Sequence, residues 1–340
     1  MTTLHPTEKD EGRRSTGTVT FDAPDYGAPP PDMPIPDRLN LCLVALVFSG
    51  GVALLWFASQ LTAWYAILLV GVAFSYLMLT NYALLHEASH GNLSSSARVN
   101  YLLGVATGLL FPIPFRLMRT THQNHHLHNR TDHEMFDQYY PTDNRLLKWL
   151  QWYAILLGLF WPVIPLGAVL FAAFPRLLRW HVLKQAKPAR GVAIVANLER
   201  SPIRAVRLEL FAILLFFCGL FWLLELKWQN TLVLYACFSF NWSTRQYVGH
   251  AFSRRDVVDG AWNLWHFPWM SWLFLHANWD LNHHRRPDVS WVYLPRLSPA
   301  GEPRISYWRQ YWRQWLGPRP CREPEPQSAP RFDAATVGNP

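Results

Sequence analysis

Three short histidine-rich segments contain most of the residues that could carry chemistry in this chain. They are, in order, His86-Glu87-x-x-His90, His122-x-x-His125-His126 and Asp280-x-x-His283-His284. Spacings of three and four residues place side chains on one face of a helix. Neutral imidazoles that share a face are common metal ligands. The three motifs therefore predict a metal site built from segments that lie far apart in the sequence.

The recurrence of this spacing carries more weight than any one motif. A single pair of histidines four residues apart also occurs at ordinary polar helix ends, whereas three such groups in one chain rarely arise by chance. The four cysteines form no Cys-x-x-Cys pair, so a thiolate zinc site is not indicated. Nitrogen and oxygen donors without thiolate favour iron over structural zinc.

The elements that position the motifs lie in a membrane. Half of the residues are apolar, only 16% are charged, and residues 39–85 contain no Asp, Glu, Lys or Arg. A membrane helix needs about 20 apolar residues, so this run predicts two spans joined near residues 60–62. The composition excludes a disordered chain and an ordinary soluble domain. The net charge of +8 does not indicate a nucleic-acid partner, because the basic residues lie between apolar segments.

Further apolar runs complete the predicted fold. Residues 99–115 are short and contain Pro112 and Pro114, which favours a re-entrant or interfacial segment. Residues 210–224 and 228–244 predict a second hairpin of spans. Residues 149–175 predict a re-entrant loop or short hairpin bent at Pro162 and Pro165. The expected fold is all-α, with two transmembrane hairpins, re-entrant or interfacial segments and a histidine-rich cap.

The distribution of Lys and Arg predicts the orientation. Basic residues concentrate in residues 176–207 and also flank the second and third motifs, and cytoplasmic loops collect such residues. We therefore expect both tails and the metal site on the cytoplasmic side, with residues 149–175 making no single crossing. Residues 1–37 and 317–340 are rich in proline and are expected to be disordered tails around a domain of residues 38–316. No cleavable secretory signal is expected.

On these motifs the chain resembles the membrane fatty-acid desaturase superfamily of histidine-box di-iron oxygenases. The resemblance covers roughly residues 40–296 and includes Asn278 before, and Pro287 after, the third box. It implies that the box histidines ligate two irons, with His250 as a further ligand from a helix end. Asp280 departs from the pattern, which expects His there. We predict that it is a ligand because it shares a helix face with His283 and His284; the alternative is a hydrogen bond to a ligand imidazole. The predicted ligands are His86, His90, His122, His125, His126, His250, Asp280, His283 and His284.

The resemblance also implies the reaction, in which O2 and two external electrons desaturate a lipid-like, fatty acyl chain. A hydroxylase or ketolase acting on a lipid, carotenoid or small amphiphile is the alternative within the superfamily. The sequence contains no heme, iron–sulfur or Gly-rich dinucleotide motif, so a separate ferredoxin, rubredoxin or cytochrome donor is expected. Aromatic residues before the third motif are interpreted mainly as interfacial anchors, with a substrate channel as the alternative: Trp262, Trp265, Phe267, Trp269 and Trp272.

Weaker candidates and rival functions complete the interpretation. Glu87 could accept a hydrogen bond from a ligand imidazole, and Asp132 or Asp137 could orient the second motif. The other histidines of the polar half are not expected to be ligands: His128, His133, His181, His266 and His276. The first motif also matches the zinc metallopeptidase pattern, with Asp259-Gly260 as its only candidate for a third ligand. That alternative, like a non-enzymatic scaffold, leaves the other motifs without a role.

Overall fold

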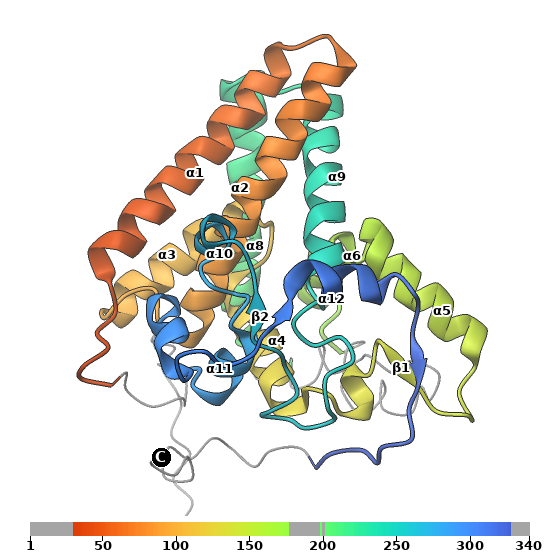
Figure 1. Ribbon diagram of the computed structural model, residues 1–340. Helices are drawn as coiled ribbons and strands as arrows, with labels where there is room; N and C mark the ends of the chain where they lie inside the picture. The colour runs from red at the N-terminus through yellow and green to blue at the C-terminus, as the bar shows by residue number, and fades with distance from the viewer. Residues whose placement is uncertain (1–29, 177–197, 199–200, 328–340) are drawn as a thin grey trace, which may run out of the picture.

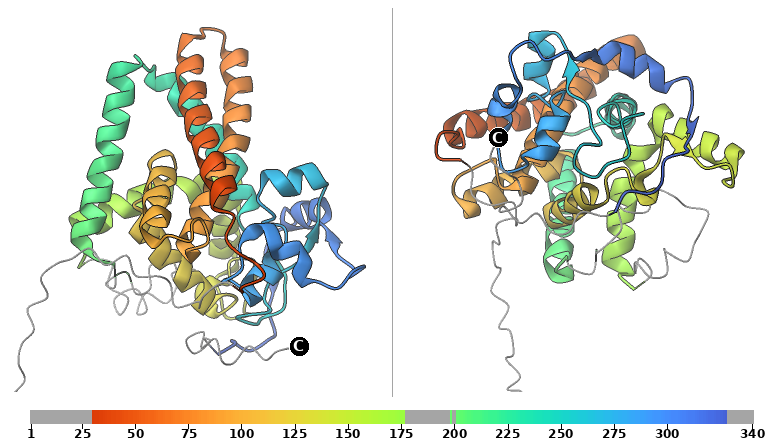
Figure 2. Two further views of the ribbon diagram at one scale, coloured as in Figure 1. Left: turned by 90° about the vertical axis from the view of Figure 1, so that its left-hand side faces the viewer. Right: turned by 60° about the horizontal axis from the view of Figure 1, so that its bottom comes forward.

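The computed structural model describes residues 30–176, 198 and 201–327. Four long helices run lengthwise, and the shorter elements gather at one wide end (Figures 1 and 2). They are α1 (Asp37–Gln60), α2 (Trp64–His90), α8 (Ile203–Leu223) and α9 (Trp228–Arg245). Helix α2 is central, because it packs against α1, α3 and α9. Apolar side chains such as Phe74 and Met78 are fully buried on α2, whereas α1 and α8 expose leucines as lipid-facing helices do.

Four helical segments are long and apolar enough to cross a membrane: α1, α2, residues 145–173 and α8. This finding supports a membrane protein of mostly helical fold. Helix α9 is not among these segments, and α8 packs mainly against α3, α4 and α6. Figure 2 shows α8 standing apart from α2 and α9 over much of its length. The second transmembrane hairpin therefore stays a prediction.

Helices α3 (Ala97–Leu110) and α4 (Phe115–His128) meet at a bend of 95°. The break coincides with the prolines that led us to expect a re-entrant segment. Glu209 of α8 holds the corner, because Tyr101 Oη donates to it at 2.6 Å and the Arg116 amide donates at 3.0 Å. Glu209 is buried in this contact.

The segment of residues 145–173 bends at a different residue from the one predicted. It consists of α5 (Arg145–Ala154), a π-helical turn η2 (Ile155–Leu159) and α6 (Phe160–Ala173). The break lies at Gly158, with φ of 100°, which glycine adopts without steric cost. Ser239 Oγ donates to the Gly158 carbonyl at 2.6 Å. The prediction of a bend at Pro162 and Pro165 was wrong, since both prolines lie within α6.

The wide end combines short elements from both halves of the chain. They are η1 (Asp132–Glu134), β1 (Gln138–Tyr139), β2 (Leu264–Trp265), α10 (Pro268–Leu273), α11 (Asp280–Arg285), η5 (Trp291–Leu297), β3 (Ile305–Ser306), α12 (Tyr307–Gln314) and β4 (Arg319–Pro320). The strands form two parallel pairs, β1 with β4 and β2 with β3. These pairs are only two residues long, so the fold remains helical in character.

The packed C-terminal part of the chain extends beyond the boundary expected at residue 316. The Arg319 amide donates to the Asp137 carbonyl and the Cys321 amide to the Tyr139 carbonyl, both at 2.8 Å. A short backbone ladder leaves no side-chain pattern, which is why composition did not reveal it. Residues 1–29 and 328–340, and nearly all of the basic loop of residues 176–200, lie outside the described residues.

Candidate metal centre

Helix α2 carries the first motif at its last turn. Gly91 follows His90 with φ of 86°, and its amide donates to Ala88, while the Asn92 amide donates to Glu87. This left-handed end is typical of a helix terminated by glycine. The helix therefore stops as soon as His86 and His90 have been placed on its buried end.

The third motif is fixed to the end of α2 by hydrogen bonds across about 200 residues of sequence. The Trp291 amide donates to Glu87 Oε2 at 3.0 Å, and Asn92 Nδ2 donates to the Pro287 carbonyl at 2.9 Å. Asn282, within α11, donates from Nδ2 to the Leu294 carbonyl at 2.9 Å. These bonds hold α11 near the end of α2, and the rings of His283 and His284 also meet those of His126 and His125 from α4, so all three motifs face one another.

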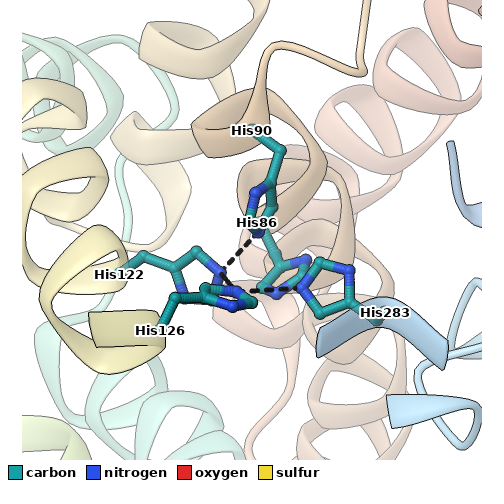
Figure 3. Close-up of side chains that lie close together, drawn as sticks. All are labelled: His86, His90, His122, His126 and His283. Carbon is teal, nitrogen blue, oxygen red and sulfur yellow. Dashed lines mark hydrogen bonds between the residues drawn. The ribbon is translucent and has the colours of Figure 1, made fainter. Parts of the chain in front are cut away.

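Five histidines form the first of two groups, which we call the five-histidine group. Its members come from α2, α4 and α11 and point toward one another (Figure 3): His86, His90, His122, His126 and His283. Their potential ligand atoms all lie within 4.8 Å of one another. The Nε2 atoms of His90 and His122 are 2.6 Å apart, and His126 Nε2 lies 3.1 Å from that of His283. The lone pairs of several rings thus converge on one small volume.

The second group adjoins the first, and we call it the mixed group because it combines His125, His250 and His284 with Asp280. His125 Nε2 lies 3.3 Å from His284 Nε2. Asp280 Oδ2 lies 3.0 Å from His250 Nε2, and Oδ1 lies 3.8 Å from His284 Nε2. A Cβ atom at Gly249 would overlap the Asp280 carboxylate, so glycine there makes room for it.

Hydrogen bonds outside the mixed group set the orientation of two of its rings. His250 Nδ1 lies 3.0 Å from the Gly260 carbonyl, and His125 Nδ1 lies 2.7 Å from Glu134 Oε2. The carbonyl can only accept, so Nδ1 of His250 carries the proton and the lone pair of Nε2 faces Asp280. Two acceptors at 3.0 Å need a cation or a proton between them.

Protonation of His250, His283 and His284 is disfavoured. Burial and the neighbouring imidazoles lower the pKa of His283 and His284 well below the ordinary value. Burial also lowers the pKa of His250, although Asp280 opposes this effect. These three rings are therefore neutral near pH 7, which is the state that ligates metal. His125 differs, because the effect of burial is outweighed by Glu134 and Asp280, which raise its pKa. A metal cation, and not a proton, is the better partner for the facing lone pairs of the mixed group.

The sequence profile of the family described as Fatty acid desaturase matches residues 61–315. The chain belongs to the fatty acid desaturase family. The matched range contains all three motifs, His250 and Asp280. No individual curated protein matches the chain. Membership of the fatty acid desaturase family implies an oxidoreductase, and the histidine groups are compatible with the metal site of such an enzyme.

The structure brings together all nine residues that the sequence analysis predicted as ligands. Eight imidazoles and one carboxylate occupy two adjoining groups, and no cysteine belongs to either group among the described residues. Nitrogen and oxygen donors in this number fit two iron ions better than one closed zinc site. The assignment of each residue as a ligand stays a prediction.

The acidic residues near the second motif have different partners from those expected. Asp137 pairs with Arg130 at 2.7 Å, and Asp132 pairs with Arg255 at 2.7 Å. Glu134, which the sequence analysis did not single out, contacts His125 instead. Three carboxylates within six residues gave no signal by which to choose among them. Glu87, predicted to accept from an imidazole, lies 3.8 Å from His86 Nδ1 and accepts from the Trp291 amide.

The remaining candidates lie outside the two groups. Neither group includes the four other described histidines of the polar half, which are His128, His133, His266 and His276. His181 lies outside the described residues. Asp259, the only candidate for a third ligand in the metallopeptidase alternative, pairs with Arg285 at 2.7 Å. That alternative therefore has no support from the geometry.

A cavity of about 350 Å³ opens onto both groups. The residues of the groups that line it are His86, His122, His125, His250, Asp280, His283 and His284. Its other walls are largely apolar and include Phe111, Phe160, Ile164, Trp242, Phe274 and Leu294. The aromatic residues considered for a channel do not line it, and most of them are exposed: Trp265, Phe267, Trp269 and Trp272. Their exposure fits the interpretation as interfacial anchors.

Proposed function

We propose that this protein is a membrane di-iron oxygenase that uses O2 and two external electrons to desaturate a lipid-like, fatty acyl chain. The observation that carries the proposal is the opening of two adjoining groups of metal donors onto one apolar cavity. Bound iron would supply the strong oxidant that an unactivated C–H bond requires and that side chains alone cannot provide. The family membership supports this class of reaction.

The chain's own residues hold and orient the metal donors. The five-histidine group would bind one iron and the mixed group the other. Glu134 and the Gly260 carbonyl fix the rotation of His125 and His250, so that each Nε2 points inward. Glu87 supports the site indirectly, because it accepts a hydrogen bond from the Trp291 amide and so connects the segment after the third motif to α2.

The cavity walls select the substrate. Apolar side chains from the corner after α3 and from α6 and α9, such as Phe111, Phe160 and Trp242, would surround a hydrocarbon chain and exclude water from the donors. Lipid-like substrates reach such a site from the bilayer. Electrons would come from a separate ferredoxin, rubredoxin or cytochrome, for which the basic surface near the third motif offers charge complementarity.

Product analysis tests the proposal directly. Membranes containing the wild-type protein should yield lipids that have lost two hydrogens, as measured by mass spectrometry, and the His283→Ala variant should yield none. A gain of one oxygen would identify a hydroxylase or ketolase instead. Purified protein that contains zinc and no iron, with no lipid product, would contradict the di-iron assignment.

The cytoplasmic orientation is also part of the proposal, and it rests on the distribution of basic residues. A cysteine introduced between residues 184 and 190, in a variant whose native cysteines are replaced by serine, should react with a membrane-impermeant reagent only after the cells are opened. Labelling of intact cells would show that this loop, and with it the metal site, has the opposite orientation.

A further inference from the structure

The last residue of α9, Arg245, lies among aromatic rings and lines the same cavity as the metal groups. Its guanidinium carbon lies 5.3–5.8 Å from the centroids of five rings, which are those of Tyr76, Phe274, Tyr307, Trp308 and Tyr311. These rings come from the α2 span and from the C-terminal part of the chain. Cation–π contacts of this kind stabilise a guanidinium but do not neutralise its charge.

The hydrogen bonds of Arg245 use only some of its N–H groups. Nε donates to Asn241 Oδ1 at 2.7 Å, and the two Nη atoms donate to Tyr307 Oη at 3.3 Å and Tyr76 Oη at 3.4 Å. A guanidinium has five N–H groups, so two have no partner that the structure describes. Among the described residues, no carboxylate lies within ion-pair distance of Arg245.

The other titratable groups around Arg245 do not supply a negative charge. Burial raises the pKa of Tyr307, so its phenol is neutral near pH 7. His266 stacks on Tyr307, and burial together with Arg245 lowers the pKa of His266 to about 4, so that this ring is neutral as well. A partly buried cation without a counter-ion is costly, and such residues in membrane proteins commonly mark a ligand site.

The cavity connects Arg245 with the metal groups. It follows one face of α2, because its lining includes Leu79, Tyr82, Ala83 and His86, which are spaced as one helix stripe. Arg245 lines the same cavity and contacts Tyr76, ten residues before His86. At 1.5 Å per residue, the charge lies about 10–15 Å along α2 from the first histidine.

We propose that Arg245 binds the anionic end of the substrate, so that the oxidised carbon lies at a fixed distance from a carboxylate or phosphate group. This inference rests on the proposed function and specifies the substrate class as an acidic lipid. Both anions offer paired oxygens that the planar guanidinium fork can bind. A free fatty acid and a phosphate-bearing lipid share this chemistry, whereas a neutral carotenoid or hydrocarbon would leave Arg245 without a counter-ion.

Equilibrium binding of labelled lipids to the purified iron-loaded enzyme in a neutral detergent tests the site without requiring turnover. Wild type should bind dodecanoate or dodecyl phosphate about 10–100-fold more tightly than dodecanol, as expected for charge-assisted hydrogen bonds. Whichever of the two anions binds more tightly identifies the headgroup. Equal binding of both acids and the alcohol by wild type would overturn the proposal, and this comparison needs no variant.

Two substitutions separate charge from packing. Arg245→Met keeps an apolar stem among the rings and should abolish the preference for acids. Arg245→Lys keeps the positive charge without the planar guanidinium and should retain part of that preference. Arg313→Met is the matched control, because Arg313 also contacts an aromatic ring, that of Phe252, but does not line the cavity. A preference that survives Arg245→Met, or that Arg313→Met removes equally, would contradict the role of Arg245.

The products distinguish this inference from the proposed function. With acids of increasing length, wild type should place the double bond at a constant distance from the acidic end. A position counted from the methyl end would contradict the inference while leaving the desaturase function intact. Acid binding that depends on Arg245, without any oxidised product from the iron-loaded enzyme supplied with reductant and O2, would contradict the proposed function and leave the anion site standing.

Discussion

The five-histidine group and the mixed group differ in what holds their rings in place. In the mixed group, His125 and His250 each have a hydrogen-bond partner outside the group, and Asp280 adds a negative charge. In the five-histidine group, His283 Nδ1 is buried without a partner among the described residues. His284 Nδ1 of the mixed group is likewise buried without a partner among the described residues, so hydrogen bonds to outside groups orient two of its three rings.

This difference also affects the chemistry expected of two bound irons. A carboxylate is a harder, anionic donor than imidazole, so the mixed group should favour the ferric state more than the five-histidine group. All four residues of the mixed group line the cavity, whereas His90 and His126 of the other group lie behind it. The mixed group therefore faces the cavity with every one of its residues, whereas the five-histidine group does so only in part.

The largest effect is expected from a central member of the five-histidine group. His122 Nε2 contacts both His90 and His126, so His122→Ala should abolish turnover and remove most of the iron. His122 lies between these two rings, so its loss removes a donor from the centre of the group. Iron content by elemental analysis and product by mass spectrometry provide the measurement.

His128→Ala is the matched control, because His128 belongs to the same helix but to neither group. It should retain about two irons per chain and substantial activity. Equal loss of iron in both variants would show that α4 has misfolded or that the ligand assignment is wrong.

A smaller effect is expected from Asp280, and its size decides whether the carboxylate is a ligand. As a ligand, Asp280→Asn should lose iron and activity together, while Asp280→His should retain both, because the family pattern has histidine at this position. As a hydrogen-bond acceptor for a ligand ring, Asp280→Asn should keep the iron and lower turnover about 10–100-fold. Full iron and near-normal turnover in Asp280→Ala would contradict both roles.

Gly249→Ala tests the same carboxylate without removing it. The added methyl group would overlap Asp280, so the carboxylate must move away from His250. We expect a loss of activity that resembles that of Asp280→Asn in kind and is smaller in size, with iron content as the second measurement. Unchanged activity and iron would show that the position of the carboxylate is unimportant.

The sequence predicted the residues of the site better than the contacts that support them. Helical spacing alone placed His86 with His90 and Asp280 with His284, since a helix repeat is a local property. Local patterns could not distinguish Glu134 from Asp132 or Asp137 as the partner of His125. The partner is determined by the fold of η1, which directs the Glu134 carboxylate toward α4.

The fold shows the same division. The uncharged run of residues 39–85 and the prolines near residue 112 predicted α1, α2 and the bend between α3 and α4. The break at Gly158 depends on a hydrogen bond from Ser239, about 80 residues away. The rings around Arg245 come from α2, α12 and the segment after α10. Such contacts form only when distant segments pack together, so no single window of sequence contains them.

The smallest effect is expected from Glu134, which lies outside both groups and orients His125 through Nδ1. Glu134→Gln keeps the shape but replaces the carboxylate by an amide, which is a weaker acceptor. Loss of such an orienting partner typically lowers metal affinity about 10–100-fold. Competition with a chelator should therefore release iron from the mixed group first, leaving close to one iron per chain.

Glu225→Gln is the control, because Glu225 is exposed between α8 and α9 and belongs to neither group, and it should titrate like the wild type. The side-chain amide introduced by Glu134→Gln cannot restore the negative charge, so high iron concentrations should recover occupancy before they recover turnover. If the chelator instead removes both irons of Glu134→Gln in one step, the two groups do not bind iron independently, and the hydrogen bond between Glu134 and His125 does not act on the mixed group alone.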